Sequence, residues 1–219
     1  MLDKSIDMDT IPIFVGVLKS FWWLLPFLLI AVVLKSPRFK GWVGESLVSR
    51  KASLKLPPEQ YHAYDNVTLP DGVGTTQIDH IYVSRFGVFV VETKNMAGWI
   101  FGAENQAQWT QTIYKRKSRF QNPIRQNYKH IKTLETLLQI PASKLHSVIV
   151  FTGDSTFKTE LPRCVCTLAN FADYIKSFSV PVLTDAEVAE IRGKIENGRL
   201  EDSGVTRSVH IQNLRNRHR

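Results

Sequence analysis

The stretch QIDHIYVSRFGVFVVETKN, residues 77–95, places two β-rich apolar runs, IYV and VFVV, on either side of a short turn. Runs of this length and composition, separated by so few residues, predict a β-hairpin in the core of a sheet. An acid stands at the outer end of each run, Asp79 on the first strand and Glu92 on the second, and Lys94 follows two residues later. The sequence therefore predicts a buried hairpin that gathers three charged side chains at one end.

The length of the hairpin loop decides which side chains face each other. With a two-residue loop at residues 85–86, Asp79 lies directly opposite Glu92, with Cβ atoms roughly 5 Å apart. A three-residue loop with a glycine bulge would shift this register by about one residue. Because side chains alternate along a strand, Glu92 and Lys94 share one face and Thr93 points away.

Two carboxylates at this spacing repel each other unless a positive charge lies between them. A divalent cation would relieve the repulsion, and hard Mg²⁺ (or Mn²⁺) takes oxygen ligands. We expect the ligands to be the carboxylates of Asp79 and Glu92, the backbone carbonyl of Thr93, and water. Lys94 would orient or deprotonate a water, or hold a phosphate oxygen. The plainer alternative is a surface ion pair between Glu92 and Lys94 on an exposed strand face.

The rest of the chain predicts helices and strands that enclose the hairpin. Hydrophobic spacing and turn residues predict helices at about 39–55, 123–140, 170–178 and 184–197, and strands at about 61–69, 98–102, 108–117 and 146–153. Asn122 is the expected cap of the second helix, and TDAE at 184–187 predicts a capping box. One apolar stripe on the second helix is expected to comprise Ile124, Tyr128, Ile131, Leu134 and Leu138. This order predicts one α/β or α+β domain.

Residues 11–34 form a strongly apolar segment, IPIFVGVLKSFWWLLPFLLIAVVL, in which Lys19 is the one charge. Its 24 residues would extend about 36 Å as a helix, against about 30 Å for the hydrocarbon core of a bilayer. We expect a single transmembrane helix, with a tilted or interfacial anchor as the alternative if Lys19 and the Trp22–Trp23 pair mark the membrane boundary. Acids precede the segment and basic residues follow it, which predicts a single-pass protein of the cell (inner) membrane with its C-terminal part in the cytoplasm.

The charge balance favours polyanionic partners. The chain carries 28 Lys and Arg against 20 Asp and Glu, a net charge of +8, which suits nucleic acid or the anionic face of a membrane. Residues 105–134 contain no acid, and their basic side chains expected to bind nucleic acid are Lys115, Arg116, Lys117, Arg119, Arg125 and Lys129. Interleaved aromatics suited to base stacking are Trp109, Tyr114, Phe120 and Tyr128. The alternative is a solvated face or a contact with lipid headgroups.

Four segments, in order, resemble the PD-(D/E)xK nuclease superfamily and, more narrowly, its nuclease-related domain family. They are GWVGESLV in the first helix, TTQIDHIYVS and GVFVVETKNMAGWIFG on the strands, and NPIRQNYKHIKTL in the next helix. The resemblance covers roughly residues 40–151 and implies a restriction-endonuclease-like mixed sheet flanked by helices. We expect a membrane anchor at 1–36, the nuclease-like domain at 37–180, and a C-terminal helix with a basic tail at 181–219.

The resemblance also implies roles for single residues. Those that match the family's catalytic set are Glu45, Asp79, Glu92, Lys94 and Gln126. Asp79 and Glu92 resemble the metal ligands and Lys94 the catalytic lysine. Glu45 resembles a first-helix acid that helps to position metal or water, and Gln126 a polar residue that supports the site. The plainer alternatives are a solvated helix residue for Glu45 and a structural residue for Gln126.

Three further positions bear on these roles. Ile78 precedes Asp79 where the superfamily pattern has proline, a departure that the superfamily tolerates. His80 alternates away from Asp79, so we expect an ordinary, partly buried histidine. Tyr128 and His130 lie close enough to Gln126 in sequence to touch substrate, although no spacing requires it. The two cysteines, Cys164 and Cys166, fit neither a disulfide framework nor a zinc site.

Two functions from different classes follow. The first is a membrane-anchored, Mg²⁺-dependent nuclease that hydrolyses phosphodiester bonds in DNA or RNA, with DNA favoured as the partner. The second is a catalytically weak or inactive tether that binds nucleic acid at the membrane. The pair of repelling acids favours the enzyme, because a binding module has no need to keep two carboxylates together. The sequence leaves the oligomeric state open, a homodimer included.

Overall fold

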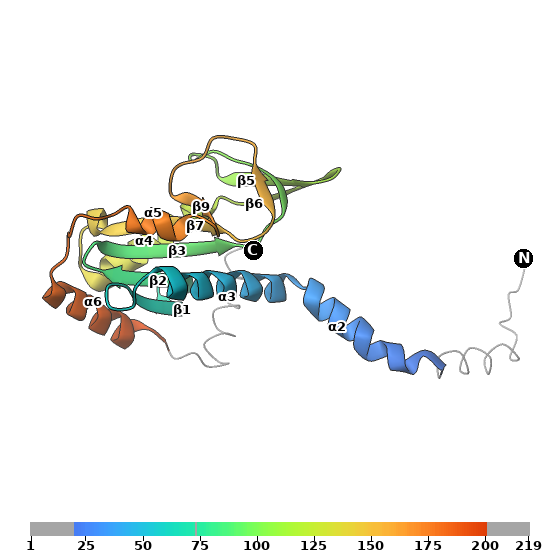
Figure 1. Cartoon of the computed structure of the whole chain (residues 1–219), viewed down its shortest axis with the longest axis horizontal. Coiled ribbons are helices and arrows are strands. Elements are labelled where there is room, and N and C mark those ends of the chain that lie inside the picture. Colours follow the sequence, from blue (N-terminus) through green and yellow to red (C-terminus); the bar gives the residue numbers. More distant parts are fainter. Residues whose placement is uncertain (1–19, 73, 201–219) are drawn as a thin grey trace, which may run out of the picture. The chain divides into compact units, whose positions relative to one another are not determined.

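The computed structural model describes residues 20–72 and 74–200 (Figure 1). These residues fall into two compact units, with the boundary between Trp42 and Val43. The N-terminal unit contains the 3-10 helix η1 (Trp22–Leu24), helix α2 (Leu25–Lys35) and the first residues of helix α3 (Pro37–Lys55). The predicted basic tail lies outside the described residues, as do residues 11–19 of the predicted membrane segment.

Two mixed β-sheets form the framework of the C-terminal unit. The five-stranded sheet has the order β1 (His62–Pro70), β2 (Thr75–Ser84), β3 (Gly87–Lys94), β7 (Leu145–Phe151) and β9 (Val165–Thr167). The four-stranded sheet has the order β6 (Arg116–Gln121), β5 (Gln108–Ile113), β4 (Gly98–Phe101) and β8 (Ser155–Phe157). Each sheet combines antiparallel and parallel pairs, and helices flank them. This mixed architecture agrees with the predicted α/β class, although the resemblance implied one mixed sheet and the structure has two.

Helices cover both faces of the five-stranded sheet. On β3, Val88 and Val90 pack in one core cluster with residues of α4 (Pro123–Leu138) and α6 (Asp185–Gly198). Phe89 and Val91 alternate to the other face and pack with residues of α3 and α5 (Phe171–Lys176). The central hairpin is therefore apolar on both faces, as its uninterrupted VFVV run predicts. A short 3-10 helix, η2 (Ala142–Lys144), joins α4 to β7.

The hairpin between β2 and β3 has the predicted two-residue loop. Ser84 pairs with Gly87, and the same register continues to the pair His80–Val91, so the three-residue alternative does not occur. Gly87 has φ 126°, a value that suits glycine because a Cβ atom there would be sterically disfavoured. The pairing stops at His80–Val91; the same register continued by one position would set Asp79 opposite Glu92.

The ladder between β1 and β2 is interrupted beside Asp79. The pairs Asp65–His80 and Val67–Ile78 form, whereas Asn66 adopts a left-handed conformation with φ 53°. The alternation of β2 changes at this point, since Ile78 and Ile81 lie in the same core cluster. Local breaks of this kind redirect side chains at the ends of regular pairing. The break lies next to Asp79, one of the two predicted metal ligands.

Predicted caps and helix positions are confirmed at two places and corrected at a third. The Asn122 side chain accepts a hydrogen bond from the Ile124 N–H at the start of α4. Thr184 and Glu187 form the capping box of α6. The stripe predicted on α4 is wrong at Tyr128, which is 57% exposed. Asn127 and His130 are buried instead; the amide nitrogen of Asn127 donates to the Val90 carbonyl and to Ser147, and both ring nitrogens of His130 have hydrogen-bond partners.

The single strand predicted at 108–117 is also wrong, since these residues belong to two strands. β5 and β6 pair from Gln108–Gln121 to Ile113–Arg116 and form a hairpin (Figure 1). Tyr114 turns the chain with φ 53°, although the loop contains none of the glycine or asparagine residues that usually signal such a turn. The basic run KRK therefore starts at the loop and continues along a second strand.

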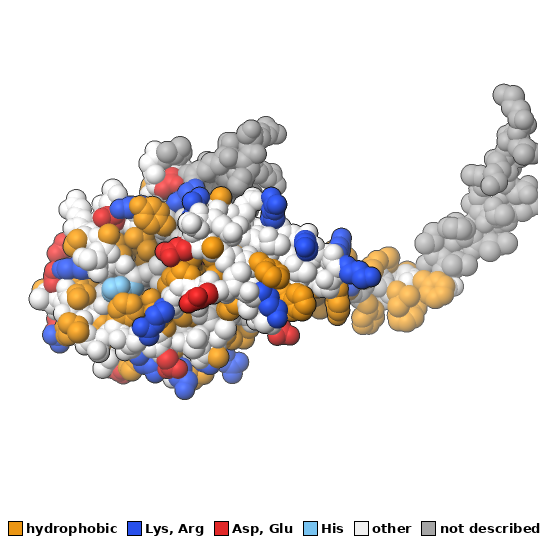
Figure 2. Space-filling model, turned by 90° about the horizontal axis from the view of Figure 1, so that it is seen from above, with side chains coloured by type: hydrophobic (Ala, Val, Ile, Leu, Met, Phe, Trp, Pro, Cys, Tyr) orange, Lys and Arg blue, Asp and Glu red, His pale blue; other side chains and the backbone are white. Residues whose placement is uncertain are grey.

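The N-terminal unit carries exposed apolar side chains along α2 (Figure 2). The helix ends at Lys35, and Ser36 adopts an extended conformation with ψ 142° before Pro37, a residue that disfavours helical geometry in its predecessor. Within residues 20–72 and 74–200, no single helix has both the length and the apolar character to cross a membrane. The bent pair Trp22–Lys35 and Pro37–Lys55, at 60°, meets that test jointly by length and composition.

Candidate active site

The predicted site residues meet at the C-terminal end of β3, beside the middle of β2. The backbone N–H of Thr93 donates a hydrogen bond of 2.7 Å to Oδ2 of Asp79. This bond joins the two strands beyond the pair His80–Val91 and holds Asp79 next to the backbone of Glu92 and Lys94. The second carboxylate oxygen of Asp79, Oδ1, is not used in this bond. The middle of β2 thus supplies one fixed carboxylate at the predicted point.

Glu92 is buried, with 2% of its surface exposed, and both of its carboxylate oxygens are engaged. Nζ of Lys94 lies 2.6 Å from Oε1, and Nε2 of His130 lies 3.2 Å from Oε2. Burial alone would raise the pKa of Glu92, but the charge of Lys94 and the bond from His130 outweigh it and lower the pKa. Glu92 is therefore a carboxylate kept ionised inside the protein, and the alternative of an exposed surface ion pair is wrong.

Lys94 is the residue that links the strand to α4. Its Nζ atom donates to Oε1 of Glu92 and also, at 2.9 Å, to Oε1 of Gln126. Because Glu92 and Lys94 contact each other directly, they share a face as predicted. Thr93 lies on the other face, where its Cγ2 atom approaches Gly44 of α3. The structure thus brings Gln126 into the site.

The start of α4 is anchored by Asn122, which is fully buried. Its side-chain amide donates to the carbonyls of Ala103, Glu104 and Gln106. Its Oδ1 atom caps the helix, and its carbonyl accepts from the N–H of Gln126. One buried side chain therefore fixes the helical turn that presents Gln126 to Lys94.

His130 is a site residue whose contacts the sequence did not predict. Its Nδ1 atom lies 2.9 Å from Oγ1 of Thr76, while Nε2 faces Glu92. With Nδ1 accepting from the hydroxyl, Nε2–H donates to the carboxylate. His130 lies one helical turn after Gln126, so the i, i+4 spacing on α4 is the signal that could have identified it. It contacts the carboxylate oxygen of Glu92 that Lys94 does not.

The pKa of Asp79 is well above its ordinary value. Burial is the largest cause, the charge of Glu92 adds to it, and the hydrogen bond from Thr93 opposes it. Glu45 also raises the pKa of Asp79, and Lys94 lowers it. Asp79 and Glu92 are therefore close enough to repel each other, as the hairpin register predicts.

Glu45 approaches the site from α3, on the other face of the sheet. Its predecessor, Gly44, allows the close approach, because a Cβ atom there would lie 2.8 Å from Oγ1 of Thr152 and 2.9 Å from Cβ of Asn95. Burial raises the pKa of Glu45, His80 opposes this effect, and Glu92 adds to it. Glu45 is partly buried rather than fully solvated, and it belongs electrostatically to the same group of acids.

A second polar network lies one turn along α3. Nδ1 of His80 is 2.7 Å from Oδ1 of Asp65, and Oγ of Ser49 donates to Oδ2 of Asp65 at 2.7 Å. His80 is fully buried rather than partly buried as predicted, and its Nε2 atom has no hydrogen-bond partner within the described ranges. The network therefore ties β1 and β2 to α3 directly behind Glu45.

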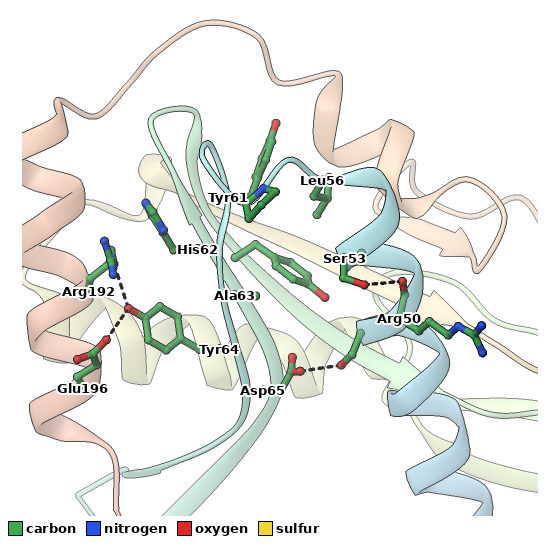
Figure 3. Close-up of a pocket in the computed structure, with 14 residues that line it drawn as sticks. Arg50, Ser53, Leu56, Tyr61, His62, Ala63, Tyr64, Asp65, Arg192 and Glu196 are labelled. Carbon is green, nitrogen blue, oxygen red and sulfur yellow. Dashed lines mark hydrogen bonds between the residues drawn. The ribbon is translucent and has the colours of Figure 1, made fainter.

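Asp65 and Ser49 also line a pocket of about 670 Å³ (Figure 3). The pocket lies along β1, the edge strand, between residues of α3 and α6. On its α6 side, the hydroxyl of Tyr64 donates to Glu196 and accepts from Arg192. None of Asp79, Glu92 or Lys94 lines this pocket, so it is separate from the predicted active site.

The acids do not form a ready-made protein cage for a metal ion. Over residues 20–72 and 74–200, no group of three or more His, Cys, Asp or Glu side chains is placed to hold one. A cation at this point would need oxygen ligands beyond side chains, such as a backbone carbonyl and water. The backbone N–H of Thr93 points to Asp79. Because the N–H and C=O of one strand residue point to the same side, the Thr93 carbonyl also faces Asp79 and could serve as such a ligand.

The predicted polyanion-binding side chains are all exposed. Lys115, Arg116, Lys117 and Arg119 lie on the β5–β6 hairpin, and Arg125 and Lys129 lie on α4. Two of the aromatics predicted to stack on bases are unsuitable: Trp109 is fully buried, and Phe120 packs partly buried against the same core cluster. Tyr114, at the hairpin loop, is 97% exposed.

Comparison with known proteins gives the class of this fold and site. Residues 40–152 match the nuclease-related domain family, and the chain belongs to this family, whose placement in the PD-(D/E)xK superfamily is consistent with the site. An uncharacterized protein of Bacillus anthracis is 39% identical over 195 residues, covering 83% of this chain and 86% of the relative. No solved structure matches the chain significantly.

Proposed function

We propose that the protein is a membrane-anchored, divalent-metal-dependent nuclease that hydrolyses phosphodiester bonds. The observation that carries the proposal is the buried Glu92 carboxylate, kept ionised by Lys94 and His130 beside Asp79. A buried ion pair of this kind contributes little net stability to a fold. Strongly perturbed acids next to a lysine are typical of functional sites instead.

Mg²⁺ or Mn²⁺ fits the donors present, although the protein supplies few of them. Oδ1 of Asp79, the Thr93 carbonyl and an oxygen of Glu92 are the hard ligands such an ion prefers. When bound, the ion activates water and stabilises charge that develops on the phosphate. Burial and repulsion by Glu92 raise the pKa of Asp79, and a bound cation would relieve this repulsion.

The chain's own residues have distinct roles in this proposal. Lys94, held by Glu92 and Gln126, is placed to orient a water or to bind a phosphate oxygen. His130 fixes the carboxylate of Glu92 in one orientation. Glu45 would position the metal or the water from α3. Membership of the nuclease-related domain family supports phosphodiester hydrolysis as the reaction class.

Nucleic acid is the proposed partner, and its path runs over exposed basic side chains. Lys129 and Lys132 line a hollow of about 650 Å³ with Tyr128, on the same helix as Gln126. The β5–β6 hairpin adds the cluster Lys115, Arg116, Lys117 and Arg119. Each phosphate contact of this kind releases bound counterions and makes affinity depend on salt.

The membrane is the second proposed partner, through residues 11–34. Support comes from α2, whose residues are apolar and exposed (Figure 2), since a run of exposed apolar side chains marks an interaction surface. The bent helix pair is compatible with an anchor that enters the membrane obliquely. The excess of basic residues after the segment favours a cytoplasmic catalytic part in a protein of the cell (inner) membrane.

A catalytically inactive tether is the second candidate. The observation in its favour is that both oxygens of Glu92 are engaged by protein groups, which makes them less available to a metal ion. In such a protein the basic surface would still bind nucleic acid, but no bond would be cleaved.

Cleavage by the full-length protein in detergent distinguishes the two candidates. Plasmid, linear duplex and single-stranded DNA would be incubated with Mg²⁺, Mn²⁺ or EDTA. Glu92→Gln and Lys94→Ala should abolish cleavage and leave binding intact, while Glu190→Gln, which alters an exposed acid on α6, should cleave normally. Cleavage that survives Glu92→Gln, or binding without cleavage in every metal, would contradict the nuclease.

A further inference from the structure

The outer face of the four-stranded sheet carries a group of side chains that the proposed active site does not use. Trp99 and Phe101 lie two residues apart on β4, so both point to the same side. They are 52% and 38% exposed, while Ile100 between them is fully buried. Large aromatic side chains exposed in this way on one sheet face are uncommon unless the face binds something.

The strand register extends this face across two more strands. Trp99 pairs with Thr112 and Phe101 pairs with Thr110 on β5. These threonines pair in turn with Lys117 and Arg119 on β6. Directly opposite residues of antiparallel strands point to the same side, so each aromatic ring has a cation in its own cross-strand row. The platform is defined here as Trp99, Phe101, Thr110, Thr112, Lys117 and Arg119.

The opposite face of the same sheet is committed to the core. Ile100 and Trp109 pack there with Ile149 and Phe151 of the five-stranded sheet. Trp109 and Trp99 thus have opposite roles, the first structural and the second exposed. Packing in the core therefore explains the aromatic residues on only one side of this sheet. The exposed aromatic residues of the platform need another explanation.

We infer that the platform binds single-stranded nucleic acid, with bases stacked on Trp99 and Phe101 and phosphates paired with Lys117 and Arg119. Paired aromatic and basic residues on antiparallel strands suit unpaired bases, since every base has a π-face. In a duplex these faces are already stacked on neighbouring base pairs and cannot reach the rings. This inference rests on the proposed function and deepens it by naming the class of substrate.

A further cation lies beside the platform. Nζ of Lys158 is 4.7 Å from the centroid of the Trp99 ring. A cation–π contact at an exposed site is weaker than the stacking of a base on an aromatic ring. A base can therefore displace the ammonium, which then remains close to the phosphate of the same nucleotide.

Chain connectivity places the platform near the proposed active site. Trp99 follows Lys94 by five residues, which limits their separation to about 17 Å even for an extended chain. At the other end, β6 is followed directly by the buried cap Asn122 and by α4, which carries Gln126. A strand held on the platform therefore ends within a few nucleotides of the acids.

Binding of labelled oligothymidylate and oligouridylate to the full-length protein, in EDTA to prevent cleavage, tests the inference. We expect Trp99→Ala and Phe101→Ala each to weaken single-strand binding roughly 5- to 100-fold, with little change for a duplex of the same length. Trp99→Phe should retain most of the affinity. A plot of log K against log salt has a negative slope, and Lys117→Gln should make that slope shallower by about 0.7.

Matched measurements distinguish base stacking from general attraction to polyanions and from lipid binding. Trp42→Ala, which removes an exposed tryptophan of the other unit, should bind oligonucleotides normally. Equal weakening for duplex and single strand, or unchanged affinity in both alanine variants, would overturn the inference. The inference would also be overturned if Trp99→Ala and Phe101→Ala lost binding to anionic lipid vesicles but kept binding to oligonucleotides. Binding that depends on Trp99 in a protein that cleaves nothing would uphold the platform and contradict the nuclease.

Discussion

The Nζ atom of Lys94 lies 2.6 Å from Oε1 of Glu92, and the glutamate carboxylate is almost completely buried. The two residues are separated by a single strand position, so they lie on one face of β3. The lysine is more accessible than the glutamate, with 21% of its side chain exposed against 3%. Lys94 can therefore reach a substrate at the surface while its charge is held by a rigid partner below.

Removing the charge of Lys94 should leave a buried carboxylate without compensation. We expect Lys94→Met to lower the free energy of unfolding by about 3 kcal/mol, and to raise the pKa of Glu92. Denaturant unfolding of the full-length protein would measure the first effect. The matched double variant, Lys94→Met with Glu92→Gln, should recover most of the loss. Additive losses in the double variant would show that the two side chains are not coupled.

Asp79 should destabilise the fold at neutral pH, because its pKa is raised by burial and by Glu92. An acid whose pKa is higher in the folded state contributes stability below its unfolded pKa and loses it as pH rises through the folded value. Asp79→Asn should therefore stabilise the protein by about 1 kcal/mol near neutral pH in EDTA. The gain should shrink as pH falls towards the ordinary aspartate range. A constant gain at all pH values would contradict this assignment.

Glu92 should show the opposite pH dependence, because its folded pKa is lowered. Its contribution to stability is present above the ordinary glutamate pKa and is lost as pH falls through the folded value. Glu92→Gln should therefore lower the free energy of unfolding most at neutral pH and least in acid. Unfolding curves for this variant and the parent, measured across the acid range, would test the sign. A cost that grows on acidification is the result that contradicts it.

His130 should act through Glu92 rather than on the substrate directly. It contacts the carboxylate oxygen that Lys94 does not, and loss of such an orienting bond typically costs about 10- to 100-fold in metal affinity or activity. We expect His130→Ala to reduce cleavage and Mn²⁺ affinity together by that factor. Glu190→Gln, which alters an exposed acid on α6, provides the control. A loss of cleavage with unchanged Mn²⁺ affinity would argue against this role.

Gly44 should be required for the approach of α3 to the ends of β3 and β7. A methyl group there would meet Oγ1 of Thr152 and Cβ of Asn95, so Gly44→Ala should cost about 1–3 kcal/mol and displace Glu45. Gly193→Ala is the matched control, because a Cβ atom at that helical position has nothing within 4 Å. It should stabilise α6 by about 1 kcal/mol. In thermal unfolding, a lower melting temperature for Gly44→Ala and a higher one for Gly193→Ala would confirm both effects.

The central hairpin could be predicted from sequence because its geometry is local. Two apolar runs and a two-residue loop determine the register, and the register brings Asp79, Glu92 and Lys94 to one end. Gln126 followed from the resemblance and the start of α4 at Asn122. The family assignment used the same segments and is confirmed by the match at residues 40–152.

Other features depend on contacts between distant segments and could not be read from local patterns. His130 is polar but buried, because Thr76 and Glu92 satisfy its two nitrogens, whereas apolar-looking Tyr128 on the same helix is exposed. The turn at Tyr114 uses a left-handed residue other than glycine. The exposure of Trp99 against the burial of Trp109 depends on which face of a short sheet packs on β7. Short strands carry no signal that separates these two faces.

Anomalous diffraction from crystals soaked in Mn²⁺ tests the central claim most directly. We predict a single strong peak within coordination distance of Asp79, Glu92 and the Thr93 carbonyl, with Nζ of Lys94 nearby but not bound to the ion. The peak should disappear in Asp79→Asn crystals. A protein that takes up Mn²⁺ elsewhere, with Lys94 and His130 still occupying both oxygens of Glu92, would contradict a metal-dependent site at the end of this hairpin.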